Sequence, residues 1–414
     1  MGSDHEAIVV GAGVAGSTAA ALLAAAGWSV ALVERRAFPR RKVCGECVAA
    51  PNLPLLDALG VGDAFAALAG PPLERVALYA GDHVIEADLP RAPDARHPWG
   101  RALGRAHLDA LLMRRAADLG ATLFPRCDVR AVRGAPGAYV AELREASGAR
   151  RELRAPVIIR AHGSWERSPV AGAARARRPR ASDLFAFKAD FSGARLACGL
   201  LPVLAFPGGY GGMVIAEGGR ATVACCIRRD RLRRCRAGAR GEPAGVAVQR
   251  FLEERCLGVR RALAGAPRVG PWLAVGPLEP GARPAWEERG GFAVGNAAGE
   301  AHPILGEGIS MAIQSAWLLC DLLRHERARL LRGAAHRDAA RRYAAEWRRR
   351  FAGRVAWSAL YAELAMRPCA RVLLPLLKRH PEWLTRAARL GGKAQRFAAR
   401  DRPSISAASF EGAA

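Results

Sequence analysis

Uncharged residues fill an unbroken stretch over 7–33, close to the start of the chain. An apolar run of that length is typical of a transmembrane helix. Glycines interrupt it directly after its first four residues, Ala-Ile-Val-Val, which have the β-branched composition of a buried strand. The pattern therefore predicts a strand over 7–10, a glycine turn, an alanine-rich helix and a second strand over 28–33.

The glycine turn has the spacing G-x-G-x-x-G over Gly11, Gly13 and Gly16. In a strand–turn–helix unit the first glycine permits the tight turn, the second lets the backbone approach a pyrophosphate, and the third lets helix and strand pack. Glu34 ends the second strand, where its carboxylate can accept hydrogen bonds from ribose hydroxyls. We therefore predict a dinucleotide site. It also includes Val14, Ala15 and Arg35.

The rest of the chain alternates between strand and helix patterns. A second strand, glycine turn and long apolar helix are predicted over 291–312. The middle of the chain contains short alternating segments broken by Gly-Gly turns, which predict strands at 184–190, 200–206, 212–216 and 221–227. Near the C-terminus a helical stripe is expected to comprise Tyr343, Trp347, Phe351, Val355 and Ala359.

Composition excludes a disordered chain, because 51% of the 414 residues are hydrophobic and 24% are charged. The formal charge of +25 is suggestive of a nucleic-acid or anionic-membrane partner. However, 59 of the 63 basic residues are arginine and only four are lysine, in a chain rich in alanine and glycine. We attribute most of this excess to a GC-rich genome and expect no nucleic-acid partner.

Ten cysteines occur as often in apolar segments as in turns, without a disulfide-like spacing. The first six residues contain two acidic side chains and no basic cluster, unlike a secretory signal. We therefore expect a reduced, cytoplasmic protein.

The segment 291–312 closely resembles the second flavin fingerprint of the FAD-dependent family that joins aromatic-ring hydroxylases, geranylgeranyl reductases and flavin halogenases. The resemblance implies that Asn296, where aspartate is usual, meets the ribityl chain, and that Pro303 lies beside the isoalloxazine ring. It also implies that a helix N-terminus at Gly306–Gly308 faces the N1/C2 carbonyl edge, where reduced flavin is negative. The remaining FAD contacts implied here are Gly295, Gly306, Gly308 and Ile309.

Two further segments resemble parts of the same family. Arg105 stands at a predicted helix start from which the family's arginine reaches the flavin, although pairing with Asp109 at i+4 is the alternative. His162 and Gly163 stand where hydroxylases carry Asp-Gly, so the resemblance assigns Gly163 to FAD. The aspartate that His162 replaces helps some hydroxylases to use NAD(P)H, and its loss leaves the way in which this chain uses NAD(P)H open. No second glycine fingerprint follows for a stable nicotinamide site. The expected electron donor is transiently bound NAD(P)H or a partner reductase.

The stretch Lys42-Val43-Cys44-Gly45-Glu46 resembles the K-x-C-G-E motif of geranylgeranyl reductases. The resemblance places Cys44 at the active side of the flavin and Lys42 near the FAD phosphates or an anionic substrate. Cys44 and Cys47 also form a C-x-x-C pair, so inert packing and a redox or metal role remain alternatives. No metal site is predicted.

The resemblance implies an α/β fold, in which a doubly wound, Rossmann-type FAD domain is interleaved with an antiparallel β-sheet substrate domain and followed by C-terminal helices. The FAD-binding domain is expected at 1–75, 101–175 and 274–330. The substrate-binding domain is expected at 76–100 and 176–273, and the helical region at 331–414.

The resemblance implies an FAD-dependent oxidoreductase with a hydrophobic small-molecule substrate. We predict that the enzyme is a monooxygenase that acts through a flavin C4a-hydroperoxide. It would hydroxylate or epoxidise an aromatic, polyketide-like or lipidic compound. Reduction of substrate C=C bonds is the alternative that K-x-C-G-E favours, and a non-catalytic flavin- or polyanion-binding protein is the second alternative. Halogenation is not expected, because the chain has no W-x-W motif.

The candidate catalytic residues are Cys44, Tyr210, His302 and Glu307. The arginine-rich C-terminal helices are expected to brace the domains, with peripheral membrane contact as the alternative.

Overall fold

The computed structural model describes residues 3–164, 178–238, 241–283, 291–367, 372–394 and 397. A parallel sheet forms from segments that lie far apart in the sequence. Its strand order is β18-β11-β1-β2-β7, so that the first strand of the chain lies at its centre. These strands are β1 (Ala7–Val10), β2 (Val30–Glu34), β7 (Thr122–Pro125), β11 (Val157–Arg160) and β18 (Phe292–Ala293).

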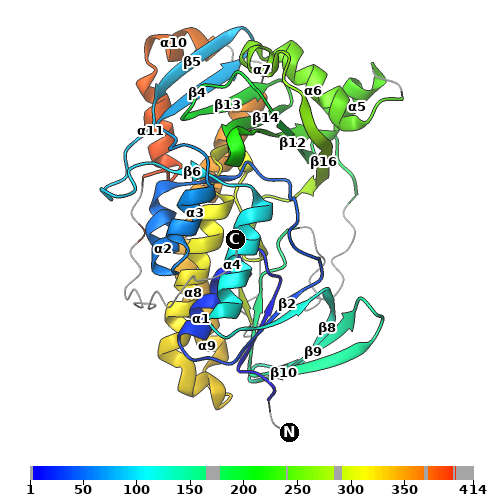
Figure 1. Cartoon of the computed structure of the whole chain (residues 1–414), viewed down its shortest axis with the longest axis vertical. Helices are drawn as coiled ribbons and strands as arrows, with labels where there is room; N and C mark the ends of the chain where they lie inside the picture. Colours follow the sequence, from blue (N-terminus) through cyan, green and yellow to red (C-terminus); the bar gives the residue numbers. More distant parts are fainter. Residues whose placement is uncertain are drawn as a thin grey trace.

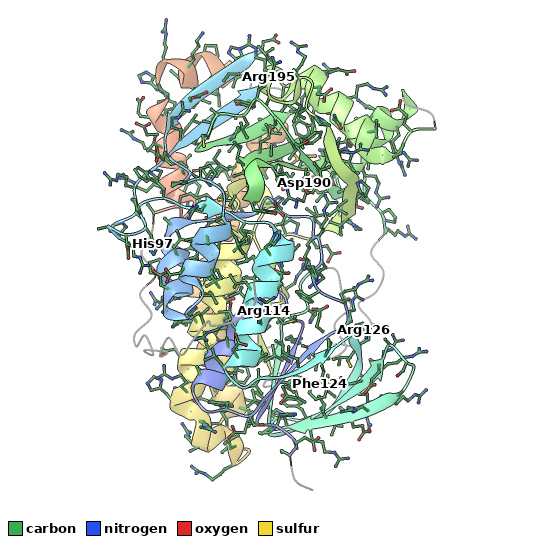
Figure 2. The ribbon with its side chains drawn as sticks, in the orientation of Figure 1. His97, Arg114, Phe124, Arg126, Asp190 and Arg195 are labelled. Atoms are coloured by element: carbon green, nitrogen blue, oxygen red, sulfur yellow. The ribbon has the colours of Figure 1, made fainter. Side chains whose placement is uncertain are left out.

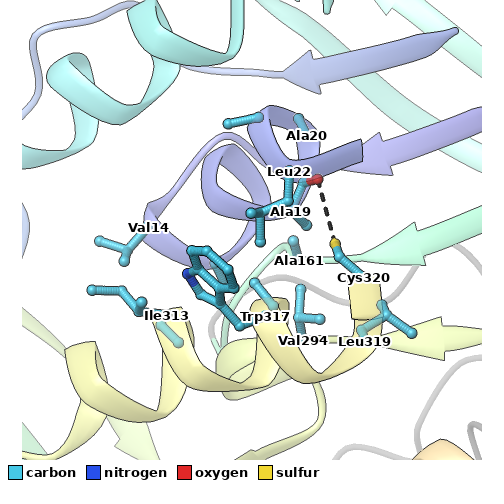
Figure 3. Packing of buried hydrophobic residues seen from close by; sticks show 14 of the residues in the cluster. Val14, Ala19, Ala20, Leu22, Ala161, Val294, Ile313, Trp317, Leu319 and Cys320 are labelled. Atoms are coloured by element: carbon cyan, nitrogen blue, oxygen red, sulfur yellow. Dashed lines mark hydrogen bonds between the residues drawn. The ribbon is translucent and has the colours of Figure 1, made fainter. Parts of the chain in front are cut away.

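Helices cover one face of this sheet. They are α1 (Val14–Ala25), α4 (Arg105–Asp118) and α8 (Gly308–Leu331). Trp317 of α8 packs against α1, and the Cys320 thiol donates a hydrogen bond to the carbonyl oxygen of Ala19 at 3.5 Å (Figure 3). The long uncharged stretch near the N-terminus therefore forms β1, α1 and β2, all of which are buried.

A small antiparallel sheet covers the other face. It consists of β8 (Cys127–Ala135), β9 (Ala138–Glu145) and β10 (Arg150–Ala155). Because side chains alternate along a strand, Ile8 and Val10 of β1 pack towards this small sheet while Ala7 and Val9 pack towards the helices. Both faces of the parallel sheet are thus buried, as its continuous apolar strands require.

A seven-stranded sheet forms the second half of the molecule, in the order β16-β12-β15-β14-β13-β4-β5 (Figure 1). Neighbouring strands are antiparallel except β13 and β4. The strands are β4 (Arg75–Ala80), β5 (His83–Asp88), β12 (Leu184–Phe191), β13 (Leu200–Phe206), β14 (Gly209–Ile215), β15 (Ala221–Arg228) and β16 (Arg268–Leu278). One face is covered by α6 (Ala244–Arg255) and α7 (Leu257–Leu263), preceded by α5 (Arg229–Ala237).

Short elements connect the two halves. A two-stranded ladder joins β3 (Cys47–Val48) to β6 (Arg101–Ala102), and a second joins β17 (Gly281–Ala282) to β19 (Gly299–Glu300). The helices α2 (Leu53–Ala58) and α3 (Gly62–Leu68) follow β3.

Helix α9 (His336–Met366) runs from the half that contains the parallel sheet towards the seven-stranded sheet, and α10 (Leu374–Arg379) and α11 (Glu382–Leu390) lie beside β4 and β5 (Figure 1). The predicted apolar stripe of α9 is partly wrong: Tyr343, Trp347 and Phe351 are buried, but Ala359 is exposed. A strict four-residue spacing drifts by about 40° per step on a helix of 3.6 residues per turn, so burial moves to Ser358.

The expected α/β class, with a parallel sheet, antiparallel sheets and C-terminal helices, is confirmed. The largest differences in strand boundaries are at two starts: β2 begins at Val30 rather than residue 28, and β14 begins at Gly209 rather than Gly212. The earlier start of β14 places Tyr210 within the sheet. No helix in the described part of the chain combines the length and the hydropathy that crossing a bilayer would need. Parts of the expected domains, at 165–177, 284–290 and 398–414, lie outside the described residues.

Candidate active site

A cavity of about 780 Å³ lies between the carboxyl ends of the parallel strands and the open face of the seven-stranded sheet. Its volume falls within the range of small-molecule sites, and its position is where open α/β sheets bind ligands. Most of the predicted FAD contacts line this cavity, namely Gly13, Val14, Ala15, Lys42, Cys44, Arg105, Gly163, Gly295, Asn296, Pro303, Gly306, Gly308 and Ile309. The cavity therefore unites two fingerprints that lie nearly 300 residues apart.

The first glycine turn is packed so closely that side chains are excluded. Gly11 has φ +104°, and a Cβ there would lie 2.6 Å from the carbonyl oxygen of Ala161. A Cβ on Gly16 would collide with the carbonyl oxygen of Gly11. Gly11 and Gly16 do not line the cavity, because they pack helix α1 against the sheet, whereas Gly13 faces the cavity. This division matches the physical role of each glycine in a pyrophosphate-binding turn.

Glu34 lies directly beside this turn at the end of β2. Its buried carboxylate accepts hydrogen bonds from the Ala12 backbone N–H at 3.0 Å and the Arg36 backbone N–H at 2.8 Å. Arg40 approaches the same carboxylate at 3.4 Å, while Arg35 is exposed and does not line the cavity. Glu34 is therefore fixed next to the turn where a ribose would follow the pyrophosphate, although it does not itself line the cavity.

The second glycine turn closes against the first. Gly295 has φ +59°, and a Cβ there would lie 2.9 Å from the Cβ of Ala15, so the two turns touch. Asn296 donates a hydrogen bond to Ser164 Oγ at 2.8 Å, which orients the amide at the cavity wall. Gly163 has φ +84°, and a Cβ there would lie 3.6 Å from Lys42 Nζ. These close approaches form a cradle in which backbone and small polar groups face the ligand, as FAD requires.

His162 replaces the aspartate of hydroxylases and does not line the cavity. Burial, with the neighbouring Arg160 and Arg283, lowers the pKa of His162 to about 4, so the ring is neutral near pH 7. Burial also raises the pKa of Glu300, which lines the cavity and lies 3.4 Å from Arg283. This wall of the site therefore carries less negative charge than an Asp-Gly motif would give it.

Arg105 begins α4 and forms a two-pronged ion pair with Asp109, at 2.6 and 2.8 Å. The predicted alternative of i, i+4 pairing is thus observed, but the pair is buried rather than on the helix surface, and Arg105 also lines the cavity. Burial opposes its charge, yet Asp109 and the hydrogen-bonded Cys44 thiol raise the pKa of Arg105. The Cys44 sulfur also accepts the Glu46 backbone N–H at 3.4 Å.

Sequence reasoning missed a buried charge cluster centred on Glu46. Its carboxylate contacts Lys188 Nζ and accepts hydrogen bonds from Thr222 Oγ1 at 2.8 Å and the Arg105 backbone N–H at 3.1 Å. Asp190 lies 3.5 Å from Lys188, and its carboxylate lies 2.8 Å from the same Thr222 hydroxyl, so that the two carboxylates share the one hydroxyl proton. Figure 2 shows Asp190 at the edge of the seven-stranded sheet that faces the other half of the molecule.

This cluster joins the K-x-C-G-E loop to β12 and β15, across the boundary between the two halves. Glu46 has φ +60°, a strained conformation for a residue other than glycine. Its hydrogen bonds therefore hold the loop in the shape that presents Cys44 to the cavity. The Glu46 of the motif was the only sequence signal for the cluster, since Lys188 and Asp190 are separated from it by more than 140 residues.

Tyr210 and His302 form a hydrogen-bonded pair, with 3.1 Å between Tyr210 Oη and His302 Nδ1. Tyr210 lines the cavity from β14, whereas His302 lies behind it and its backbone N–H donates to Ser358 Oγ at 2.9 Å. Burial, followed by the Cys226 thiol, raises the pKa of Tyr210 well above its ordinary value. Burial lowers the pKa of His302. Both groups are therefore neutral near pH 7, and the phenol retains its proton.

Glu307, the fourth candidate catalytic residue, does not line the cavity. It is buried at the N-terminus of α8, with Arg354 and Lys393 each 3.5 Å from its carboxylate. Its oxygens face these two cations instead of the cavity. This placement disfavours Glu307 as an acid or base and assigns it to the support of the glycine turn.

Cys44 of the C-x-x-C pair lies in the loop before β3, and Cys47 begins that strand. Cys44 and Cys47 are both free thiols, and burial raises the pKa of Cys47. Among the residues that the structure describes, no group of three or more His, Cys, Asp and Glu side chains is arranged to hold a metal ion.

The mouth of the cavity is apolar and cationic. Several of the hydrophobic side chains that line it are also 40–48% exposed, namely Leu364, Leu373, Trp383 and Leu390. They come from α9, α10, α11 and the adjoining residues, and Arg367 and Arg386 lie among them. Exposed apolar side chains gathered at one opening mark a binding surface rather than a random surface composition.

Comparison with known proteins agrees with the flavin site. Residues 4–192 match the model of the FAD binding domain family. The menaquinone reductase of Mycobacterium tuberculosis is 30% identical over 178 residues, which are 41% of this chain and 43% of that protein. The match thus spans less than half the length of this relative. The tryptophan 2-halogenase of Chondromyces crocatus is 33% identical over 127 residues, 31% of this chain and 24% of that protein.

Solved structures are similar over nearly the whole chain. The myxobacterial chondrochloren halogenase has a TM-score of 0.74 at 20% identity, with 93% of this chain and 91% of that chain covered. The geranylgeranyl bacteriochlorophyll reductase-like protein of Thermoplasma acidophilum has a TM-score of 0.68 at 19% identity, with 92% and 91% covered. At these identities the likeness shows the fold. Residues 4–192 thus match an FAD binding domain, and the chain as a whole shares the fold of these proteins.

Proposed function

We propose that this protein reduces a carbon–carbon double bond of a long hydrophobic substrate, the reaction that the sequence offered as an alternative to oxygenation. The observation that carries the proposal is the Tyr210–His302 pair, a neutral proton donor on the wall of a largely apolar cavity. Reduction of a double bond needs such a donor, because one carbon must receive a proton.

The residues described above fit FAD at one side of the cavity. Gly13 and the N-terminus of α1 would hold the pyrophosphate, Asn296 the ribityl chain, and Pro303 and the α8 N-terminus the isoalloxazine ring. Bound reduced FAD would supply two electrons and one hydrogen to the first carbon of the double bond. The electron donor proposed for FAD is NAD(P)H or a partner reductase.

Tyr210 would complete the reaction by donating its phenolic proton to the second carbon. The Tyr210 oxygen would then regain a proton taken up from the medium through its hydrogen-bonded partner His302. Burial keeps both groups neutral before the step, so no charged side chain has to be desolvated at the substrate. Arg105 and the Glu46 cluster would hold Cys44 and its loop at the cavity wall while the substrate binds.

The substrate class follows from the cavity mouth and from the relatives. The exposed apolar rim and its arginines suit a lipidic molecule taken from an anionic membrane surface, and we include peripheral membrane contact in the proposal. The relative with 30% identity is a menaquinone reductase, and a structural neighbour is geranylgeranyl reductase-like. Both names support an isoprenoid chain as the substrate.

Monooxygenation remains the second candidate. The apolar cavity can exclude water, which oxygen transfer from a flavin also requires. In that reaction the Tyr210 hydroxyl would orient the substrate through a hydrogen bond instead of protonating an alkene carbon.

An anaerobic reaction distinguishes the candidates. Chemically reduced holoenzyme is mixed with a menaquinone in the absence of oxygen, and the product is then exposed to air, which returns any quinol to the quinone. We expect a product that still carries two additional hydrogen atoms in its isoprenoid tail. An unchanged tail under nitrogen, together with a product that contains an added oxygen atom under air, would refute reduction and establish monooxygenation.

A further inference from the structure

Lys393 lies on the cavity wall, outside both flavin fingerprints. It follows α11, and its ammonium nitrogen is 3.4 Å from the Gly306 carbonyl oxygen, 3.5 Å from Glu307 Oε1 and 3.6 Å from Cys47 Sγ. Only 11% of its side chain is exposed. Burial of a charged lysine costs free energy, so the position of Lys393 beside the glycine turn that begins α8 calls for an explanation.

The N-termini of α1 and α8 face the cavity at its two glycine turns, and FAD has two regions that carry negative charge. The pyrophosphate is always negative and suits the G-x-G-x-x-G turn before α1. The pyrimidine edge of the flavin becomes negative on reduction. The second N-terminus, at Gly308 of α8, is therefore left for that edge, and Lys393 lies beside it.

The local charges leave a net positive charge at this position. Lys393 and Arg354 both contact Glu307, and Arg354 also donates a hydrogen bond to Gln314 Oε1 at 2.8 Å. Burial opposes the charge of Lys393, but the Cys47 and Glu307 groups raise its pKa, so it stays protonated. Two cations around one carboxylate give one uncompensated charge. Arg354 alone balances the charge of Glu307, so the positive charge of Lys393 remains uncompensated.

The chain reaches this position through a tight glycine turn. A Cβ on Gly391 would lie 3.3 Å from Leu305 Cδ2, and a Cβ on Gly392, where φ is +93°, would lie 3.1 Å from Glu307 Oε2. The turn after α11 is thus packed directly against the second flavin fingerprint. Its close fit delivers the ammonium group to one place on the cavity wall.

We propose that Lys393 supplies the positive charge that stabilises the reduced, anionic pyrimidine edge of FAD at the N-terminus of α8. This inference rests on the FAD site of the proposed function, but it does not depend on which substrate is reduced or oxygenated. The C-terminal segment thereby sets the reduction potential of a cofactor that the first 330 residues bind.

The test is the two-electron reduction potential of FAD bound to Lys393→Met, with Lys393→Arg and Lys378→Met as comparisons. Lys393→Met is expected to lower the equilibrium constant for reduction about tenfold, which is about 30 mV for a two-electron couple. Lys393→Arg keeps the charge and is expected to stay near the wild type. Lys378 is an exposed lysine on α10 that does not line the cavity, so its replacement should leave the potential unchanged.

Sulfite provides a second readout that needs no turnover, because its addition to oxidised flavin places negative charge on the same edge. Lys393→Met should bind sulfite about tenfold more weakly than the wild type. An unchanged potential and sulfite affinity in yellow Lys393→Met protein would overturn the inference and leave Lys393 as a structural latch. Failure of the wild-type protein to bind FAD would instead overturn the FAD site itself.

Discussion

Replacement of Tyr210 by phenylalanine tests the proton donor of the proposed reaction. The change removes the hydroxyl that is hydrogen-bonded to His302 Nδ1 at 3.1 Å and leaves the ring in its buried place on β14. An unmade hydrogen bond at a buried ring nitrogen costs about 1–3 kcal/mol of folding free energy. A positioned acid contributes about 10²- to 10⁴-fold to the rate of a proton-transfer step. We therefore expect a modest loss of stability and a large loss of turnover.

The assay separates the two half-reactions in a stopped-flow instrument without oxygen. Reduction of the bound FAD should proceed at the wild-type rate in Tyr210→Phe, while reoxidation by the alkene substrate should slow about 10²-fold or more. Tyr343→Phe is the matched control, because Tyr343 is a buried tyrosine whose hydroxyl donates to the Ala293 carbonyl oxygen at 2.9 Å but does not line the cavity. It should lose comparable stability and keep its rate. Equal reoxidation rates in both variants and the wild type would refute Tyr210 as the donor.

Three further predictions concern the glycine turn, a buried histidine and the cavity mouth. Gly16→Ala should lose FAD, measured as flavin absorbance after gel filtration, whereas Gly353→Ala, where a Cβ meets no neighbour, should retain it. Because the folded-state pKa of His162 is lowered to about 4 from 6.5, the unfolded state binds more protons between these values, and stability is lost as the pH falls through that window. Urea titrations of the wild type and of His162→Gln at pH 7 and pH 4 measure this loss of unfolding free energy. The wild type should lose up to about 3 kcal/mol more than His162→Gln between the two pH values. The same loss in both proteins would contradict a lowered pKa of His162. Leu373→Asp combined with Leu390→Asp should weaken sedimentation with anionic vesicles and leave binding to neutral vesicles low, whereas unchanged sedimentation would argue against membrane contact at the mouth.

The features that could be predicted from the sequence are those encoded locally. The strand, glycine turn and helix at 7–25 follow from a continuous pattern, and the close approach of Gly11 to Ala161 shows why that pattern demands glycine. The flavin role predicted for the turn at 295–308 rests on its resemblance to a known family, since no periodicity specifies a cofactor. Arg105 was found in the same way.

The features that could not be predicted depend on contacts between distant segments. Glu46, Lys188 and Thr222 meet only because the large sheet folds over the loop that carries Cys44. Lys393 reaches Gly306 from the far end of the chain. The prediction of the apolar stripe of α9 was partly wrong for a different reason. Burial along a helix follows its period of 3.6 residues and not a fixed spacing of four.

In the proposed reaction, FAD in this cavity delivers electrons to a carbon–carbon double bond without oxygen. The most direct measurement follows the oxidised-flavin absorbance of reduced holoenzyme mixed anaerobically with geranylgeraniol, an isoprenoid alkene that has no quinone to accept electrons. We expect the absorbance to return while an equal amount of alcohol with one saturated double bond forms. Flavin that stays reduced until air enters, and an alcohol that then carries an oxygen atom from O₂, would contradict it.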